Sequence, residues 1–179
     1  MKDLSLNILD VAHNSIRAGA KLIEITMDWQ DTLLTVTIKD NGCGMSEEML
    51  KTVTDPFTTS RTTRRVGMGL PLFKLAAEQT GGQLSIDSRL GEGTTVTAVF
   101  HTDHIDCPPA GDIASTAALI AGALQDGSDL IFTERNGQNE FCLDTAQIRE
   151  VLGPDIPLGD PSVQAWLSGY MEEQEKTIR

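Results

Sequence analysis

The residues best suited to bind a ligand lie together at positions 40–45, in the order Asp-Asn-Gly-Cys-Gly-Met. They follow an alternating apolar segment, residues 34–38, which predicts a strand. Gly42 and Gly44 allow the backbone to bend sharply and to approach a flat ligand closely. The Asp40 carboxylate, at the end of that strand, can accept a hydrogen bond from an exocyclic amine. An ordinary strand-to-loop turn has the same pattern, so the neighbouring segments must decide between the two interpretations.

A stripe of polar residues marks the segment 3–20, whose apolar spacing predicts a helix. The stripe residues are spaced three, four and three apart and therefore project from one side of that helix. A solvated helix face would have this composition, and so would a magnesium site with a base beside it, because an amide oxygen suits a Mg²⁺ ion that keeps several waters. The members of the stripe are Asn7, Asp10, Asn14 and Arg17.

Residues 57–67 form a basic segment rich in hydroxyl groups, in a protein of net charge −12. Such a segment indicates an anion, and phosphate in particular, although an exposed loop remains the alternative. Gly67 and Gly69 precede a predicted helix at 70–80, and a helix N-terminus beside flexible glycines suits a polyphosphate. The arginines of the segment are Arg61, Arg64 and Arg65.

The predicted elements of residues 1–104 combine into an α+β sandwich. Two hairpins supply a mixed, mostly antiparallel sheet of at least four strands, and the predicted helices cover one face of it. The expected strands are residues 23–27, 34–38, 84–88 and 94–100.

The second part of the chain, residues 105–179, opens with a Pro- and Gly-containing stretch at 106–111 that marks a domain boundary. Its sequence pattern predicts a helix, two strands joined by an Asn136-Gly137 turn, and two further helices. No nucleophile, metal cluster or glycine loop is recognisable in it. We therefore divide the chain into a domain at 1–104 and a small C-terminal α/β module at 105–179 for docking or dimerisation.

The composition narrows the choice of partners. The chain has 26 acidic and 14 basic residues, so nucleic acid and anionic membranes are unfavourable partners. It contains no run of apolar residues long enough for a membrane span. Three cysteines without metal-ligand spacing suggest reduced thiols and a cytoplasmic location.

Taken together, the motifs resemble the Bergerat-fold ATP-binding domain of the GHKL superfamily, which includes type II topoisomerases, ninety-kilodalton heat-shock chaperones, histidine kinases and mismatch-repair ATPases. The resemblance covers residues 4–100. Its motifs are Asp10-x-x-x-Asn14, Asp40-x-Gly42-x-Gly44, Asp55-Pro-Phe57, Gly67-x-Gly69-Leu70 and Gly91-Glu-Gly93-Thr94-Thr95. The short segment at about 58–66, in the position of the family's lid over the nucleotide, looks most like that of histidine kinases and anti-sigma-factor serine kinases. Residues 14–20 look more like the mismatch-repair type.

The resemblance implies a role for each matching residue. Asp40 would accept the adenine amino group, with Thr95 supporting it through a water molecule. Asn14 would hold Mg²⁺ on the phosphates, Arg17 would face the phosphates, and Asp10 stands where the family has a glutamate base. The remaining implied nucleotide-binding residues are Gly42, Gly44, Met45, Phe57, Arg61, Arg64, Gly67, Met68, Gly69 and Leu70.

Two departures from the family pattern shape the expected function. Asp10 is one methylene shorter than glutamate, which makes water activation harder because a base must come within about 3 Å. No helix pair with a phospho-accepting histidine precedes Asp10 in this sequence, and His13 reads as structural.

We therefore expect a Mg-ATP-binding regulatory protein that binds ATP and ADP and acts on a separate protein, with homodimerisation left open. A kinase of the histidine or serine type is the leading interpretation. An ATP-gated binding switch with slow or absent hydrolysis is the alternative, and a mismatch-repair-type ATPase is the third.

Overall fold

The structure is a computed structural model and describes residues 3–55 and 68–178. Pairs of strands alternate with one or two helices along the chain, and their bounds agree closely with those expected from the hydrophobic periodicity. In chain order they are α1 (Leu4–Arg17), β1 (Leu22–Gln30), β2 (Leu33–Asp40), α2 (Glu47–Thr52), α3 (Gly69–Gln79), β3 (Gln83–Arg89), β4 (Gly93–His101), α4 (Ile113–Ala123), β5 (Asp129–Asn136), β6 (Asn139–Asp144), α5 (Thr145–Leu152) and α6 (Pro161–Ile178).

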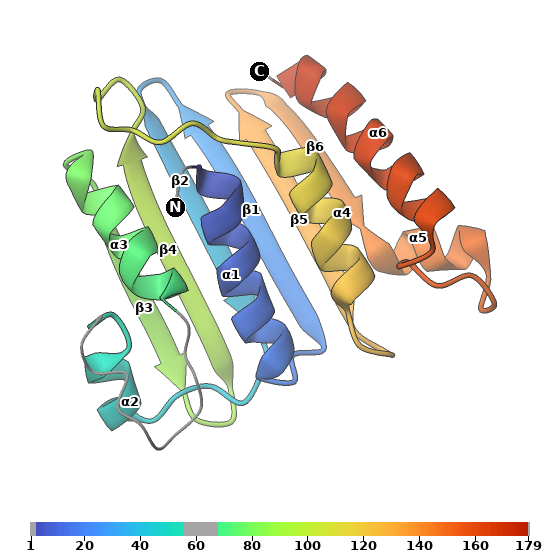
Figure 1. Ribbon diagram of the computed structural model, residues 1–179, viewed down its shortest axis with the longest axis horizontal. Helices are drawn as coiled ribbons and strands as arrows, with labels where there is room; N and C mark the ends of the chain where they lie inside the picture. Colours follow the sequence, from blue (N-terminus) through green and yellow to red (C-terminus); the bar gives the residue numbers. More distant parts are fainter. Residues whose placement is uncertain (1–2, 56–67, 179) are drawn as a thin grey trace.

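The strands form one six-stranded sheet in the order β3-β4-β2-β1-β5-β6. In the described part of the chain, β1 and β5 run parallel and the other neighbouring strands are antiparallel. Helices α1, α3 and α4 lie side by side over one face of the sheet, and α6 lies beyond α4 (Figure 1). This arrangement confirms the predicted α+β sandwich with a mostly antiparallel sheet and helices on one face.

The core is mainly aliphatic, as the low aromatic content requires. Alternate residues of the two central strands point under the helix layer and are fully buried, which is the burial expected for a sheet covered on that face. They are Ile23, Ile25 and Met27 from β1 and Leu34, Val36 and Ile38 from β2. Phe73 of α3 packs on Phe100 of β4, with ring centroids 5.7 Å apart.

The sheet does not stop at residue 104, because β5 pairs with β1 from Leu22 opposite Asp129 to Trp29 opposite Asn136. The register pairs Ile25 with Phe132, and both side chains are fully buried in the same apolar cluster. Residues 105–179 therefore extend the sheet and the core of the first part. The division into two domains after residue 104 stays a prediction.

Helix α1 is fixed to the C-terminal part at both of its ends. At its start, the Leu4 and Ser5 amides donate to the carbonyls of Pro109 and Ala110, at 3.0 and 2.9 Å. Just past its end, the Ser128 hydroxyl and the Asp129 amide donate to the carbonyls of Ala20 and Lys21, at 3.0 and 2.9 Å. The otherwise unsatisfied first amides of the helix thus have partners in the linker between β4 and α4.

Candidate functional site

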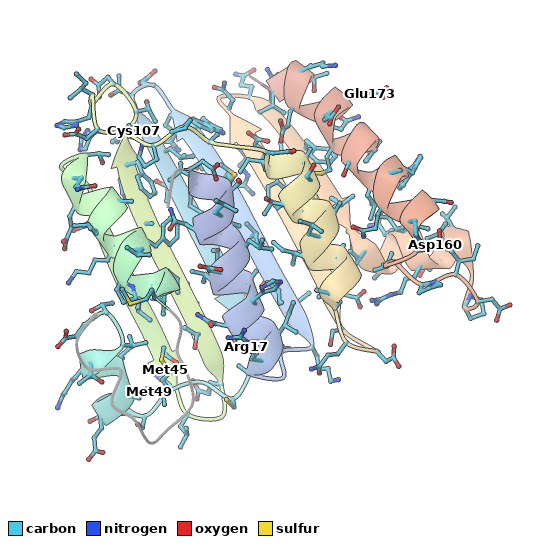
Figure 2. All side chains as sticks on the ribbon, viewed as in Figure 1. Arg17, Met45, Met49, Cys107, Asp160 and Glu173 are labelled. Carbon is cyan, nitrogen blue, oxygen red and sulfur yellow. The ribbon has the colours of Figure 1, made fainter. Side chains whose placement is uncertain are left out.

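A pocket of about 610 Å³ opens where α1, the loop after β2, α2 and the start of α3 meet above the sheet. Its walls are mostly apolar, with a few polar groups converging on it, which is the usual character of a small-molecule site. The lining residues are Val11, Asn14, Ser15, Arg17, Ala18, Asp40, Cys43, Gly44, Met45, Met49, Val53, Leu70, Thr94 and Val96. Figure 2 shows Arg17, Met45 and Met49 around the same end of the sheet.

The carboxylate of Asp40 is held in place from two sides. Its Oδ2 accepts a hydrogen bond from the Ser15 hydroxyl at 2.6 Å, and its Oδ1 accepts one from the Gly42 amide at 2.9 Å. Ser15 is buried on α1, whereas Asp40 is only half-buried and faces the pocket. Because each carboxylate oxygen can accept two hydrogen bonds, Asp40 retains capacity for a donor in the pocket.

The glycine loop after Asp40 is pinned to its surroundings by backbone hydrogen bonds. The Cys43 amide donates to the Ala18 carbonyl at 3.0 Å, and the Met45 amide donates to the Ser88 hydroxyl at 2.9 Å. Gly44 has φ +67°, and a Cβ at this position would fall on the carbonyl oxygen of Arg89. Only glycine therefore fits where the loop packs against the β3–β4 hairpin.

Asn14 and Arg17, one turn apart at the end of α1, line the pocket. In the part of the chain that the structure describes, the Asn14 side chain has no hydrogen-bond partner, so its amide is available to a ligand. Arg17 is exposed in the last turn of the helix, where a cation is favoured by the helix dipole.

Asp10 lies one turn before Asn14, outside the pocket lining, and faces the first residue of α3. A Cβ on Gly69 would come within 2.9 Å of the Asp10 Cβ, so glycine permits this close approach of the two helices. The other polar residue of the predicted stripe, Asn7, is buried, and its Nδ2 donates to the Asp3 carbonyl at 3.3 Å. Of the predicted stripe, Asn14 and Arg17 thus line the pocket, Asp10 lies outside its lining and Asn7 is buried.

One predicted residue, Thr95, lies outside the pocket lining. Thr95 does not line the pocket, whereas Thr94 and Val96 do, because side chains alternate between the two faces of β4. The Thr94 hydroxyl lies 2.8 Å from that of Ser88 and, by register, its residue pairs with Asp40. Thr94 is therefore the threonine of this strand that stands beside Asp40 at the pocket, and the role expected of Thr95 stays a prediction.

The other predicted binding residues are distributed as follows. Gly44, Met45 and Leu70 line the pocket, and the Gly42 amide donates a hydrogen bond to the Asp40 carboxylate. Met68 precedes α3 and is exposed, without lining the pocket. Phe57, Arg61, Arg64 and Gly67 lie outside the described residues.

Two hydroxyl residues that complete the site were missed by the sequence reasoning. Ser15 is the first, and its hydroxyl next to Asn14 in the sequence is the signal that could have indicated it. Ser88 accepts from the Met45 amide and donates to the Gly93 carbonyl at 3.0 Å, so it ties the glycine loop to the β3–β4 turn. Nothing in the local sequence of β3 indicates this role.

Comparison with known proteins identifies the domain. Residues 2–104 match the family model described as histidine kinase-, DNA gyrase B- and HSP90-like ATPase. The chain belongs to this ATPase family. The predicted resemblance is thereby confirmed, and the match supports ATP as the ligand of the pocket.

Curated relatives of this ATPase domain include sensor kinases. The signal transduction histidine-protein kinase AtoS of Escherichia coli (strain K12) is 32% identical over 100 residues, covering 56% of this chain and 16% of AtoS. The sensor protein SrrB of Staphylococcus aureus (strain NCTC 8325 / PS 47) is 36% identical over 100 residues, covering 53% of this chain and 17% of SrrB. The chain thus spans less than a fifth of the length of these relatives.

A solved structure shares the fold over a longer stretch. The crystal structure of the N-terminal domain of a DNA repair protein superposes with a TM-score of 0.54 at 15% identity, covering 79% of this chain and 52% of that chain. Coverage of 79% is more than residues 2–104 alone could supply. The likeness in fold therefore reaches into residues 105–179.

The residues of the pocket fit an adenine nucleotide of the kind that the ATPase family binds. Val11, Met45 and Val96 provide apolar walls for a flat ring, and Asp40 provides an acceptor for its amine. Among the described residues no group of three or more His, Cys, Asp and Glu is placed to hold a metal ion. Asn14, whose amide oxygen is a suitable ligand for a Mg²⁺ ion that keeps most of its waters, lines the same pocket.

The helices that the structure describes give no candidate for a membrane span, since none combines sufficient length with sufficient apolar character.

Proposed function

We propose that this chain is a Mg-ATP-dependent protein kinase that transfers the γ-phosphate to a hydroxyl or imidazole of a separate protein. The observation that supports this most is the arrangement of α1. A single helix holds Asp40 through Ser15 and presents Asn14 and Arg17 to the same pocket. The adenine end and the phosphate end of the nucleotide are thereby fixed relative to each other.

Positioning matters more than a strong base in phosphoryl transfer, because the reaction depends mainly on alignment and on stabilisation of charge. Asn14 would hold the magnesium ion against the phosphates, and Arg17 would add positive charge at the pocket rim. The ion would supply charge neutralisation at the phosphates when bound. A single asparagine ligand is adequate for this because Mg²⁺ keeps most of its waters.

Asp10 is the candidate base. It is exposed on α1, one turn from Asn14 and against Gly69 at the start of α3. In the proposed reaction the partner's oxygen or nitrogen bonds to the γ-phosphorus while the bond from that phosphorus to the ADP oxygen breaks. Asp10 accepts the proton that the partner's group loses.

The test is to incubate the chain with ATP labelled in the γ-phosphate and with the proteins encoded beside its gene, and to locate any labelled residue. Asp10→Asn should slow the transfer by roughly 10²–10⁴-fold if proton removal limits the rate. Asp87→Asn, an exposed carboxylate on β3, is the matched control and should leave the transfer unchanged. A fast basal ATPase that collapses in Asp10→Asn, with no labelled partner, would contradict the kinase and favour the mismatch-repair-type ATPase.

The second candidate is an ATP-gated switch that binds a partner without phosphorylating it. The attachment of α1 to the C-terminal part at both ends favours it. A shift of α1 on nucleotide binding would also displace α4 and the linker between β4 and α4. In this case no partner would carry label, yet partner affinity would differ between the ATP-bound and free forms. That pair of results separates the two candidates.

A further inference from the structure

The outer face of α6 carries an ordered and exposed aromatic pair. Trp166 is 52% exposed and stacks on Tyr170, with ring centroids 5.3 Å apart and planes 5° from parallel. Tyr170 in turn meets Phe141 of β6 edge-on at 5.7 Å. The indole is therefore supported on one side by a chain of rings that ends in the core, while much of the ring stays open to solvent.

The contrast with the second tryptophan is informative. Trp29 is half-buried, and its Nε1 donates to the carboxylate of buried Glu134 at 2.9 Å, so its role is structural. In the described part of the chain, the Trp166 indole N–H has no such acceptor. An exposed tryptophan held in one orientation loses little conformational freedom when it is covered, which is why such residues often anchor protein interfaces.

The exposed residues of α6 recur at helical spacing and define a single face, hereafter the α6 face. Gly169 lies on it one turn after Trp166, and a Cβ there would meet no atom within 4 Å, so this part of the helix surface is open. Glu173 follows Trp166 after two turns. The members of the α6 face are Ser162, Ala165, Trp166, Gly169, Glu172, Glu173 and Lys176.

The C-terminal part of the chain, which carries the α6 face, is acidic, and the face itself has Glu172 and Glu173 against Lys176. Residues 105–179 contain 13 of the 26 acidic residues and only four of the 14 basic ones, so they carry nine of the twelve net negative charges. Arg135 and Arg149 are already paired with Glu140 and Asp129, at 2.6 and 2.5 Å. Asp160 directly precedes α6, and Glu173 lies in its C-terminal half (Figure 2). Lys176, at the far end, is the one basic residue of the face.

We propose that the α6 face docks a basic segment of a separate protein. An arginine or lysine of that segment lies over the open side of the Trp166 indole, which attracts cations, and further basic side chains pair with Glu172 and Glu173. Nucleic acid and anionic membranes would be repelled, and a second copy would bring the same acidic face. The inference deepens the proposed function, because it names the surface that would hold the protein partner, and it requires no phosphoryl transfer.

The test uses a synthetic amphipathic 18-residue helix with arginines flanking a leucine stripe, added to the ¹⁵N-labelled full chain without ATP. The two indole N–H signals provide an internal comparison. The Trp166 signal should shift on titration and the Trp29 signal should not. Trp166→Ala, and the double variant Glu172→Gln/Glu173→Gln, should each weaken binding by about tenfold or more. The matched control is Glu47→Gln/Glu48→Gln, two exposed acids on α2, which should bind the peptide as the unaltered chain does.

Several results would overturn this inference. They are an unmoved Trp166 signal, equal binding by Trp166→Ala, equal binding of a peptide with glutamine in place of arginine, or a homodimer in sedimentation experiments that Trp166→Ala dissolves. The last would assign the face to a second copy of the chain. Because the experiment contains no nucleotide, its failure leaves the kinase proposal standing, and failure of the labelling experiment leaves this one standing.

Discussion

At the scale of single residues, the site depends on how Asp40 is held. The sequence indicated Asp40 itself, because a carboxylate before a glycine pair is a local pattern. It did not indicate that Ser15 holds Asp40, or that Thr94 rather than Thr95 lines the pocket. Both depend on which side of a helix or strand faces the pocket. A shift of one residue on a strand exchanges the two faces, so local sequence leaves that choice open unless the register is known.

Ser15→Ala should weaken ATP binding. The Ser15 hydroxyl donates to Asp40 Oδ2 at 2.6 Å, and its loss would remove one of the two charge-assisted hydrogen bonds that hold the carboxylate, leaving only that from the Gly42 amide. We expect a loss of about 1–3 kcal/mol in binding free energy, measured by calorimetry. Ser85→Ala, on the exposed side of β3, is the control and should bind normally. An unaltered affinity in a folded Ser15→Ala protein would argue against this role.

ATP should protect one cysteine from alkylation. Cys43 is exposed and lines the pocket, whereas Cys142 is exposed on β6, at the far side of the sheet. Burial raises the pKa of the Cys107 thiol, which therefore holds less reactive thiolate near neutral pH. Mass spectrometry after brief treatment with iodoacetamide should show slower labelling of Cys43 with ATP present and no change at Cys142. Equal protection of both would indicate a general effect rather than occupancy of the pocket.

At the scale of elements, the hairpins and helices were predictable because each has a local signal. Alternation marked the strands, Ser46 and Asp112 cap α2 and α4 as their types suggest, and glycines end several elements. The way in which the elements support the site was less visible. The β3–β4 hairpin contacts the glycine loop through Ser88 and the Arg89 carbonyl, a contact between segments more than 40 residues apart.

Gly44→Ala should destabilise the fold more than Gly91→Ala does. Both glycines have positive φ, +67° and +81°, so both variants incur the strain of the left-handed region, about 1–2 kcal/mol. A Cβ on Gly44 would also collide with the Arg89 carbonyl, whereas one on Gly91 meets nothing within 4 Å. We expect Gly44→Ala to lower the free energy of unfolding by roughly 1–3 kcal/mol more than Gly91→Ala does, in urea denaturation. An equal loss of unfolding free energy in the two variants would show that the loop can move away from the Arg89 carbonyl at little cost.

At the scale of the whole molecule, the continuous sheet is what the sequence did not predict. The two strands of the C-terminal part were recognisable, but their neighbours were not, because β1 pairs with β5 across about 100 residues of chain. Parallel pairing leaves no short turn in the sequence to signal it. The C-terminal part therefore looked like an appendage, although it supplies strands to the sheet and contacts to α1.

A fragment of residues 1–104 should be much less stable than the full chain. It would lose β5 from the edge of β1 and α4 from the side of α1, exposing an apolar strand edge. Thermal unfolding should show a lower midpoint, with aggregation, and a fragment of residues 1–144 should recover much of the difference. A 1–104 fragment that melts like the full chain would instead support two independent domains.

The central claim is that an adenine nucleotide binds with its amine against Asp40, and calorimetry with ATP and GTP in the presence of Mg²⁺ tests it most directly. Asp40→Asn keeps an acceptor for the Gly42 amide but places a donor toward the adenine amine. We expect the unaltered chain to bind ATP in preference to GTP. The variant should lose about 1–3 kcal/mol of ATP binding free energy while melting near the original temperature. Unchanged ATP affinity in a folded Asp40→Asn protein would contradict the account.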